Sequence, residues 1–434
     1  MENQINTVSG LFDKGKLFLK SVFIFIMALG LFIPTQFTRE LVRERKERQM
    51  EAINDISGKW GSSQVLTGPI LKVPYQENTR DERGVPLIVK RTAYFMPDKL
   101  DIKAEIDPEV RKRGIYEVVV YRSKIRATGN FKEIRWKELG VPAENILWAD
   151  AQVVFHVSDV LRGVNEDLFL NWAGKKIPFG PQAQLGELKD ALSAPVTLTA
   201  DSLNEPLEFD MQFNLNGSGS LLVSAGGREN SIDMRSGWTS PKFTGVKLPD
   251  ERKVSDSGFT ANWKHMNRTV PLVWKDKTYD LSPSALGTEL IVSVDGYDKT
   301  ERSIKYALLC IVLTFAAFFL IESIYKKPLH LVQYALAGLA LVLFYTLLLS
   351  LSEYLGFNLA YGIAAFSTIG LVTWFVGGVM KSGRLGLFIA MVLAVVYSYI
   401  FTIIQMQDFA LLMGSVGLFL ALAVIMYFSR KIQW

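Results

Sequence analysis

Three histidines and one cysteine are the residues of this chain best suited to metal or acid–base chemistry. His156 lies in a strand-like pattern, His265 in a polar turn region, and His330 at the start of an apolar segment that follows the one containing Cys310. Zinc sites need closely spaced ligands, as in H-E-x-x-H, and no such spacing occurs in this sequence. We therefore expect no metal site, and each histidine is better explained as a hydrogen-bonded or solvated side chain.

The sequence also lacks signatures of covalent or nucleotide chemistry. It contains no G-x-S-x-G nucleophile elbow, no S-x-x-K and no Walker A sequence. Gly217-Ser218-Gly219 begins like a dinucleotide fingerprint, but Leu222 stands where the third glycine belongs and the surrounding residues alternate as in strands. We expect no cofactor and no catalytic residue, which favours a protein that is not an enzyme.

Two carboxylates inside apolar segments remain as candidates for chemistry. Glu322 and Glu353 each lie near the end of such a segment. An acidic side chain within a membrane is by default a candidate for function. Both of these acids, however, are close enough to an interface to reach headgroups or water. We favour this second explanation, in which the acids have no functional role. If the protein acted through a membrane cavity, these acids would line it together with Tyr345 and Ser352.

Charge is distributed unevenly over the 434 residues that must position these groups. Between Arg39 and Ile304 there are 38 basic and 38 acidic side chains, whereas the remaining 168 residues contain 10 basic and 5 acidic ones. The chain is thus a polar block among apolar segments, which excludes a wholly soluble enzyme and a disordered chain. Because the block has no net charge, a nucleic-acid partner is excluded as well.

Six apolar segments are long enough to span a bilayer, whose hydrocarbon core needs about 20 helical residues. They cover residues 17–37, 306–324, 331–355, 359–380, 385–405 and 409–429. The first resembles a signal peptide, but no small-residue cleavage site follows Ile33, so we expect an uncleaved signal anchor.

Basic residues in the short flanks of these segments alternate from one side to the other. They are Lys14, Lys16, Lys20, Lys326, Lys327, Lys381, Arg384, Arg430 and Lys431. By the positive-inside rule, both termini are predicted to be cytoplasmic and the polar block lies outside. The polar block has no cysteine, which is typical of a bacterial periplasmic domain, so we expect a multi-pass protein of the bacterial inner membrane.

Periodicity divides the polar block into a helix followed by strands. Residues 39–56 are predicted to continue the first helix as a stalk that ends near Gly58. We expect the charged residues of this stalk to be solvated, in preference to forming a binding surface. Leu207, Phe209 and Met211 then alternate with polar residues, as in a strand with one wet face. Further strands are predicted at 65–73, 87–95, 100–106, 115–125, 146–157, 220–224 and 289–294.

These patterns predict an α-helical polytopic membrane protein of six transmembrane helices. A large extracytoplasmic, mainly antiparallel, sandwich-like β domain is inserted between helices 1 and 2, in one lobe or in two with a boundary near 181–195. The predicted parts are 1–38, the cytoplasmic N-terminus and first helix; 39–304, the periplasmic domain with its stalk; and 305–434, helices 2–6.

Several stretches of the sequence resemble the CreD family of bacterial inner-membrane proteins. They are residues 305–322 and 330–353 in the apolar segments, and 66–74, 217–221, 226–228 and 258–263 in the polar block, while 161–195 match least. The resemblance implies a cell-envelope integrity protein, associated with a two-component regulon and with tolerance to envelope-directed toxins and β-lactams. That family has no established catalytic residues to carry over.

Two hypotheses of function follow. In the first, a non-enzymatic membrane protein supports envelope integrity through a periplasmic domain that meets an envelope protein, a lipid or a glycan, with the lipid bilayer as its other partner. In the second, the protein is a membrane-embedded enzyme or a lipid or solute translocator that uses a cavity among helices 2–6.

Overall fold

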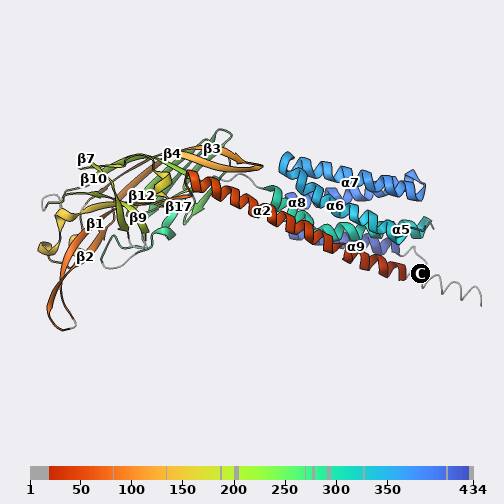
Figure 1. The fold of residues 1–434 in the computed structure, drawn as a ribbon, viewed down its shortest axis with the longest axis horizontal. Helices are drawn as coiled ribbons and strands as arrows, with labels where there is room; N and C mark the ends of the chain where they lie inside the picture. The colour runs from red at the N-terminus through yellow and green to blue at the C-terminus, as the bar shows by residue number, and fades with distance from the viewer. Residues whose placement is uncertain are drawn as a thin grey trace, which may run out of the picture. The chain divides into compact units, whose positions relative to one another are not determined.

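A computed structural model of the chain (Figure 1) describes residues 19–81, 83–132, 134–185, 188–199, 205–268, 270–275, 279–290, 295–325, 328–406 and 409–429. The chain forms two compact units. Met1–Gln49 and Ser293–Trp434 make up the membrane unit, and Met50–Val292 make up the β-rich unit.

The membrane unit is helical because its sequence consists of apolar runs that satisfy their backbone hydrogen bonds internally. It contains the first part of α2 (Phe32–Trp60), then α4 (Asp295–Lys305), α5 (Ala307–Tyr325), α6 (Leu331–Leu355), α7 (Phe357–Met380), α8 (Gly383–Gln405) and α9 (Ala410–Ser429). Gly356 alone separates α6 from α7, and Lys381 and Ser382 separate α7 from α8. Such short connections place successive helices antiparallel, and α6, α7 and α8 pack against one another in chain order.

Five helices in the described part of the chain are long and apolar enough to cross a membrane. They are Leu19–Trp60, Ala307–Tyr325, Leu331–Leu355, Phe357–Met380 and Gly383–Gln405. The sixth predicted segment forms α9. Its apolar part, Leu412–Val424, is shorter than the five helices above. The structure therefore has helices suited to a membrane, while the count of six spans stays a prediction.

The β-rich unit contains two sheets. Its nine-stranded sheet has the order β13 (Pro241–Gly245), β17 (Ala285–Leu290), β11 (Ser220–Ser224), β1 (Gln64–Arg80), β5 (Gln152–Val157), β9 (Leu188–Pro195) and β8 (Gly180–Leu185), with β2 (Pro86–Phe95) beside β1 and β16 (Val273–Lys275) beside β2. Its eight-stranded sheet has the order β14 (Glu251–Ser255), β15 (Gly258–Met266), β12 (Glu229–Ser236), β3 (Lys99–Arg113), β4 (Tyr116–Phe131), β10 (Leu207–Ser218), β6 (Phe169–Trp172) and β7 (Lys175–Pro178). Short helices connect them: η1 (Trp136–Leu139), η2 (Ala143–Asn145), η3 (Trp148–Asp150), α3 (Val160–Gly163) and η5 (Ser282–Ser284).

One hydrophobic core joins the two sheets. Phe155 of the nine-stranded sheet packs edge-on against Phe213 of the eight-stranded sheet, with ring centroids 5.6 Å apart. Phe243 and Phe259 make the same kind of contact between the sheets at 5.6 Å. Because the buried residues form a shared cluster, the unit is one sandwich-like body and not two lobes. Near the weakly indicated boundary at 181–195, β9 pairs with β5 in the same sheet.

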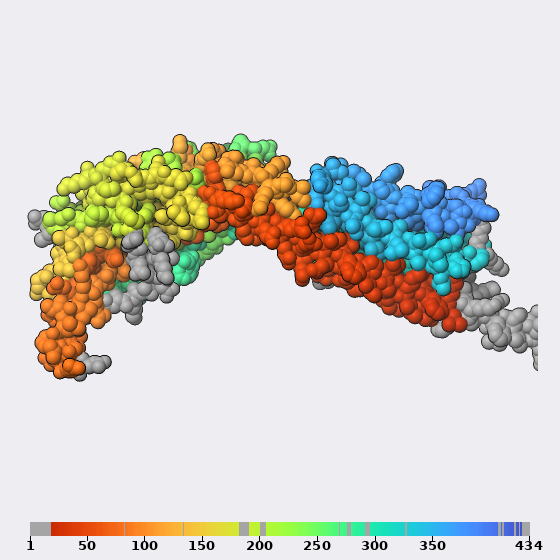
Figure 2. All heavy atoms as spheres, in the orientation of Figure 1, coloured from red at the N-terminus to blue at the C-terminus, as the bar shows by residue number. Residues whose placement is uncertain are grey.

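The pairing is antiparallel at most strand pairs, with β1–β11 and β3–β12 parallel. The hairpin of β1 and β2 extends beyond the rest of the β-rich unit as a finger, seen in orange in Figure 2. Along β10, apolar side chains are buried and the polar ones between them are exposed or half-buried, as the alternation predicts. This alternation gives the eight-stranded sheet one dry face and one wet face.

Candidate functional site

Glu322 takes part in a local network near the end of α5. Its side chain is 9% exposed, and it accepts a hydrogen bond of 3.0 Å from the Tyr334 hydroxyl. The Lys20 ammonium forms an ion pair with the same carboxylate and also donates to the Leu329 carbonyl at 2.6 Å. A buried charge needs such partners, so the first membrane helix, α5 and α6 are tied together at this point.

Glu353 forms a second network near the end of α6. Its side chain is 7% exposed and accepts a 2.9 Å hydrogen bond from the Tyr297 hydroxyl of α4. The Arg45 guanidinium of α2 lies 3.4 Å from the same carboxylate oxygen. Both predicted acids therefore have nearby partners that neutralise or solvate their charge.

The structure does not bring the four predicted membrane residues together. Tyr334, the partner of Glu322, and Glu353 lie 19 residues apart on α6, which is about 28 Å at 1.5 Å per residue. Tyr345 is fully buried, and its hydroxyl has no hydrogen-bond partner among the described residues. Ser352 donates to the Leu349 carbonyl at 2.9 Å, within its own helix.

Two cavities in the membrane unit are lined by described residues, and neither includes any of these four. The larger, of about 640 Å³, lies among α5, α8 and α9 and is apolar apart from the Tyr325 and Tyr399 hydroxyls. The smaller, of about 390 Å³, lies between α6 and α7.

Charges that the sequence assigned to a solvated stalk also have partners within the membrane unit. Lys46 of α2 lies 2.7 Å from Asp298 and 2.8 Å from Glu301 on α4. Burial lowers the pKa of Lys46, but hydrogen bonds and attraction from the two carboxylates outweigh it and raise the pKa above its usual value. Nothing in the sequence pattern of either helix alone could have revealed this contact.

The histidines are dispersed. His156 is buried on β5 opposite Thr67 of β1, and His265 is on β15 opposite Asn230 of β12. Burial, followed by the charge of Lys247, lowers the pKa of His265. Over the described ranges, no three histidine, cysteine, aspartate or glutamate side chains form a group that could hold a metal ion.

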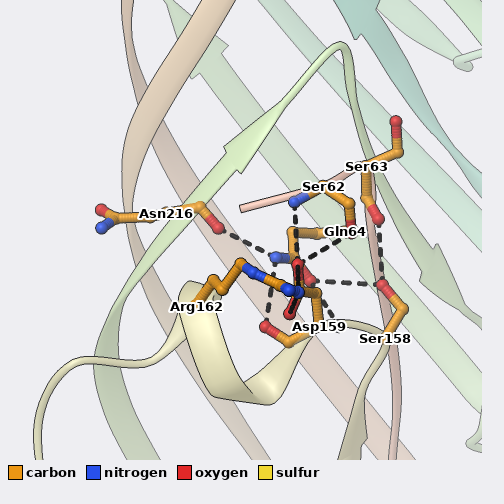
Figure 3. Close-up of polar contacts among 7 residues, drawn as sticks. All are labelled: Ser62, Ser63, Gln64, Ser158, Asp159, Arg162 and Asn216. Atoms are coloured by element: carbon orange, nitrogen blue, oxygen red, sulfur yellow. Dashed lines mark hydrogen bonds and ion pairs between the residues drawn. The ribbon is translucent and has the colours of Figure 1, made fainter. Parts of the chain in front are cut away.

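A cluster of polar contacts in the β-rich unit lies where α2 ends and β1 begins (Figure 3). The Asp159 carboxylate accepts hydrogen bonds from the Ser62 backbone at 3.0 Å and from the Ser62 hydroxyl at 3.1 Å. The Arg162 guanidinium contacts the same carboxylate at 3.3 Å. Burial raises the pKa of Asp159, but these hydrogen bonds and the Arg162 charge outweigh it and hold the pKa below its usual value.

Gln64 completes this junction. Its side-chain amide donates to the Asn216 carbonyl at 2.9 Å, and its side-chain oxygen accepts from the Asp159 backbone at 3.2 Å and from the Ser158 hydroxyl at 3.2 Å. A side chain on Gly163 would come within 2.6 Å of the Gln64 amide nitrogen, so glycine lets α3 approach closely. Because these groups hold each other, the junction is a structural clamp that joins the segment after α2 to α3 and to both sheets.

Beside this clamp, the wet face of the eight-stranded sheet contains a cleft of about 1110 Å³. Four basic and three acidic side chains line it, together with amides, hydroxyls and two aromatic rings. Trp60, the last residue of α2, lies at its edge, with the Arg111 guanidinium 3.8 Å and the Arg122 guanidinium 5.1 Å from the ring centroid. The sequence showed that these strands have a wet face, but it did not show which strands are neighbours.

The comparisons with known proteins agree with the architecture. The family described as "Inner membrane protein CreD" matches residues 16–434. The inner membrane protein CreD of Escherichia coli (strain K12) is 31% identical over 429 residues, covering 97% of this chain and 94% of that protein. A crystal structure from Parabacteroides distasonis, described as a candidate protease, aligns with a TM-score of 0.22 at 10% identity over 66% of this chain and 59% of its own, a likeness too small to carry an argument. Because the family model matches nearly the whole of this chain, the chain belongs to the CreD family of inner membrane proteins.

Proposed function

We propose that this protein is a non-enzymatic inner-membrane protein that supports cell-envelope integrity, and tolerance to envelope-directed toxins and β-lactams, through its β-rich unit. The observation that carries the proposal is the contrast between the two units. A large cleft lined mainly by polar residues lies in the β-rich unit, whereas Glu322 and Glu353 each take part in a local network in the membrane unit. The membrane unit then anchors and positions the domain that does the work.

Complementation tests this proposal. A bacterial strain that lacks the protein should be more sensitive to a β-lactam or to an envelope-directed toxin, and expression of the full chain should restore survival. We expect this sensitivity because, without the β-rich unit, the envelope component that it binds would no longer be kept in order. A deletion strain with unchanged survival under both challenges would contradict the proposal.

A membrane-embedded enzyme or a lipid or solute translocator is the second candidate. The apolar cavity among α5, α8 and α9 favours a lipid chain as its occupant. Chemistry or ion coupling would need polar groups within that space, and the predicted acids do not line it. The observations therefore support this candidate less well than the first.

The proposal includes an orientation with six spans, cytoplasmic termini and residues 39–304 in the periplasm. Among the basic flanks that support it, Lys381 and Arg384 lie at the turn between α7 and α8, whereas Lys14, Lys16, Lys326, Lys327, Arg430 and Lys431 lie outside the described residues. A reporter enzyme active only in the periplasm should be active when inserted at Gly84, in the turn of the β1–β2 hairpin, and inactive when fused after Ser382. An active fusion after Ser382 would reverse the proposed orientation.

A further inference from the structure

The polar cleft contains a row of side chains that crosses six strands of the eight-stranded sheet. Strand register places the members of the row opposite one another from each strand to the next. In order from β14 to β10, they are Lys253, Thr260, Arg235, Glu105, Lys124 and Asn214. Neighbouring strands lie about 4.8 Å apart, so the row is roughly 24 Å long. All six side chains are exposed and line the cleft.

Two lysines of this row have charges that the sheet does not neutralise. Arg235 forms an ion pair with Glu105, which fixes both side chains at the centre of the row. Lys124 and Lys253 have no carboxylate within ion-pair distance among the residues that the structure describes, and four strand spacings, about 19 Å, separate them. The row therefore presents two cations whose backbone positions are about 19 Å apart, with hydroxyl and amide groups beside them.

A second row lies two residues farther along the same strands. Asp107, Arg122 and Asn216 stand opposite one another on β3, β4 and β10. The Arg122 guanidinium lies over the Trp60 ring, so an aromatic surface borders the polar groups. Across the strands, the cleft thus combines paired and unpaired charges with amide and hydroxyl groups, and the Trp60 ring borders them.

This chemistry selects among the classes of ligand. A lipid chain or a protein hot spot needs an apolar pocket, whereas most of the residues that line this cleft are polar. A nucleic acid needs a strongly basic surface, whereas four basic and three acidic side chains nearly balance here. A long polymer with hydroxyl and amide groups on every unit, and with carboxylates at intervals, can use each of these features.

We infer that this cleft binds a linear glycan strand that carries carboxylates, with Lys124 and Lys253 as the groups that recognise the acids. The inference rests on the proposed function and names the chemical class of the envelope partner. Cell-wall glycan freed of its stem peptides, which has free lactyl carboxylates, and a polyuronate share this chemistry. The hydroxyl and amide groups of the row bind the sugar units, and the two cations favour an acidic strand over a neutral one.

Binding of purified full-length protein in lipid nanodiscs tests the inference. The probes are cell-wall glycan strands freed of stem peptides, a hexauronate, and a neutral β-1,4-linked N-acetylglucosamine hexamer. The variants are Lys124→Ala/Lys253→Ala and the control Lys103→Ala/Lys132→Ala, which removes two exposed lysines of the same unit that do not line the cleft. All four side chains are exposed, so neither variant removes buried contacts.

Wild type and the control should bind an acidic strand at least tenfold more tightly than the neutral hexamer. Replacing the two cleft lysines should weaken acidic binding by about tenfold for each, because each removes a charge-assisted hydrogen bond. The tighter of the two acidic probes identifies the source. Equal binding by wild type and the cleft variant, equal binding of acidic and neutral strands, or no binding of either acidic strand would overturn the inference. Survival of the complemented deletion strain decides the proposed function separately.

Discussion

Replacing Asp159 with alanine should destabilise the β-rich unit by about 3 kcal/mol, because the change removes a buried acceptor and leaves the half-buried Ser62 donors and the Arg162 charge without their partner. The carboxylate accepts from Ser62 twice and from Arg162, and its side chain is 8% exposed. For a unit of this size the loss corresponds to a fall in Tm of roughly 6–12 °C. Thermal unfolding of the full-length protein, followed by tryptophan fluorescence, measures it.

Asp210→Ala is the matched control for this prediction. Asp210 also pairs with an arginine, Arg126, at 2.9 Å, but the two side chains are 35% and 57% exposed. Exposed pairs contribute at most about 1 kcal/mol, so the control should unfold close to wild type. If the two variants lost the same stability, the junction would not be the clamp that its contacts indicate.

The pH dependence of the Asp159 contribution follows from the direction of its pKa shift. The pKa is lower in the folded protein than the ordinary value of 3.8, so ionised Asp159 stabilises the fold. This contribution is complete above the unfolded pKa and is lost as the pH falls through the folded pKa. The difference in stability between wild type and Asp159→Asn should therefore be constant from about pH 7 to pH 5 and shrink in more acidic solution.

Local patterns predicted much of the fold because they report directly on burial. The alternation of Leu207, Phe209 and Met211 identified the buried face of β10, and the charged run after Arg39 continued as helix to Trp60. The prediction of a strand that begins at Ile146 was wrong for its first residues. Backbone hydrogen bonds to the Leu147 and Trp148 carbonyls close short 3₁₀ turns there, and β5 starts at Gln152.

The candidate sites depended on contacts that no local pattern contains. Asp159 meets Ser62 across 97 residues, and Lys46 meets Glu301 across 255. The row in the cleft exists only because six strands adopt one register, two of them in parallel. Glu322 and Glu353 could be named from the sequence as unusual, but their separation along α6 and their partners required the tertiary structure.

Survival of a complemented deletion strain should depend on the cleft far more than on the membrane carboxylates. Glu322→Gln/Glu353→Gln keeps side-chain shape and an acceptor for the Tyr334 and Tyr297 hydroxyls, while it removes both charges. Proton or ion coupling through these acids would fail in that variant, whereas a bundle that positions the β-rich unit needs only the fold. Lys124→Ala/Lys253→Ala leaves the membrane unit unchanged and removes the two unpaired cations of the cleft.

The central claim is that the β-rich unit carries the function, and survival under a β-lactam at matched protein abundance in the membrane tests it most directly. We predict survival within about twofold of wild type for the double-glutamine variant and for Lys103→Ala/Lys132→Ala. For Lys124→Ala/Lys253→Ala we predict survival near that of the deletion strain, because the loss of two charge-assisted contacts weakens the affinity for the ligand about a hundredfold. Full survival of the cleft variant together with loss of survival in the double-glutamine variant would contradict the claim and place the function in the membrane unit.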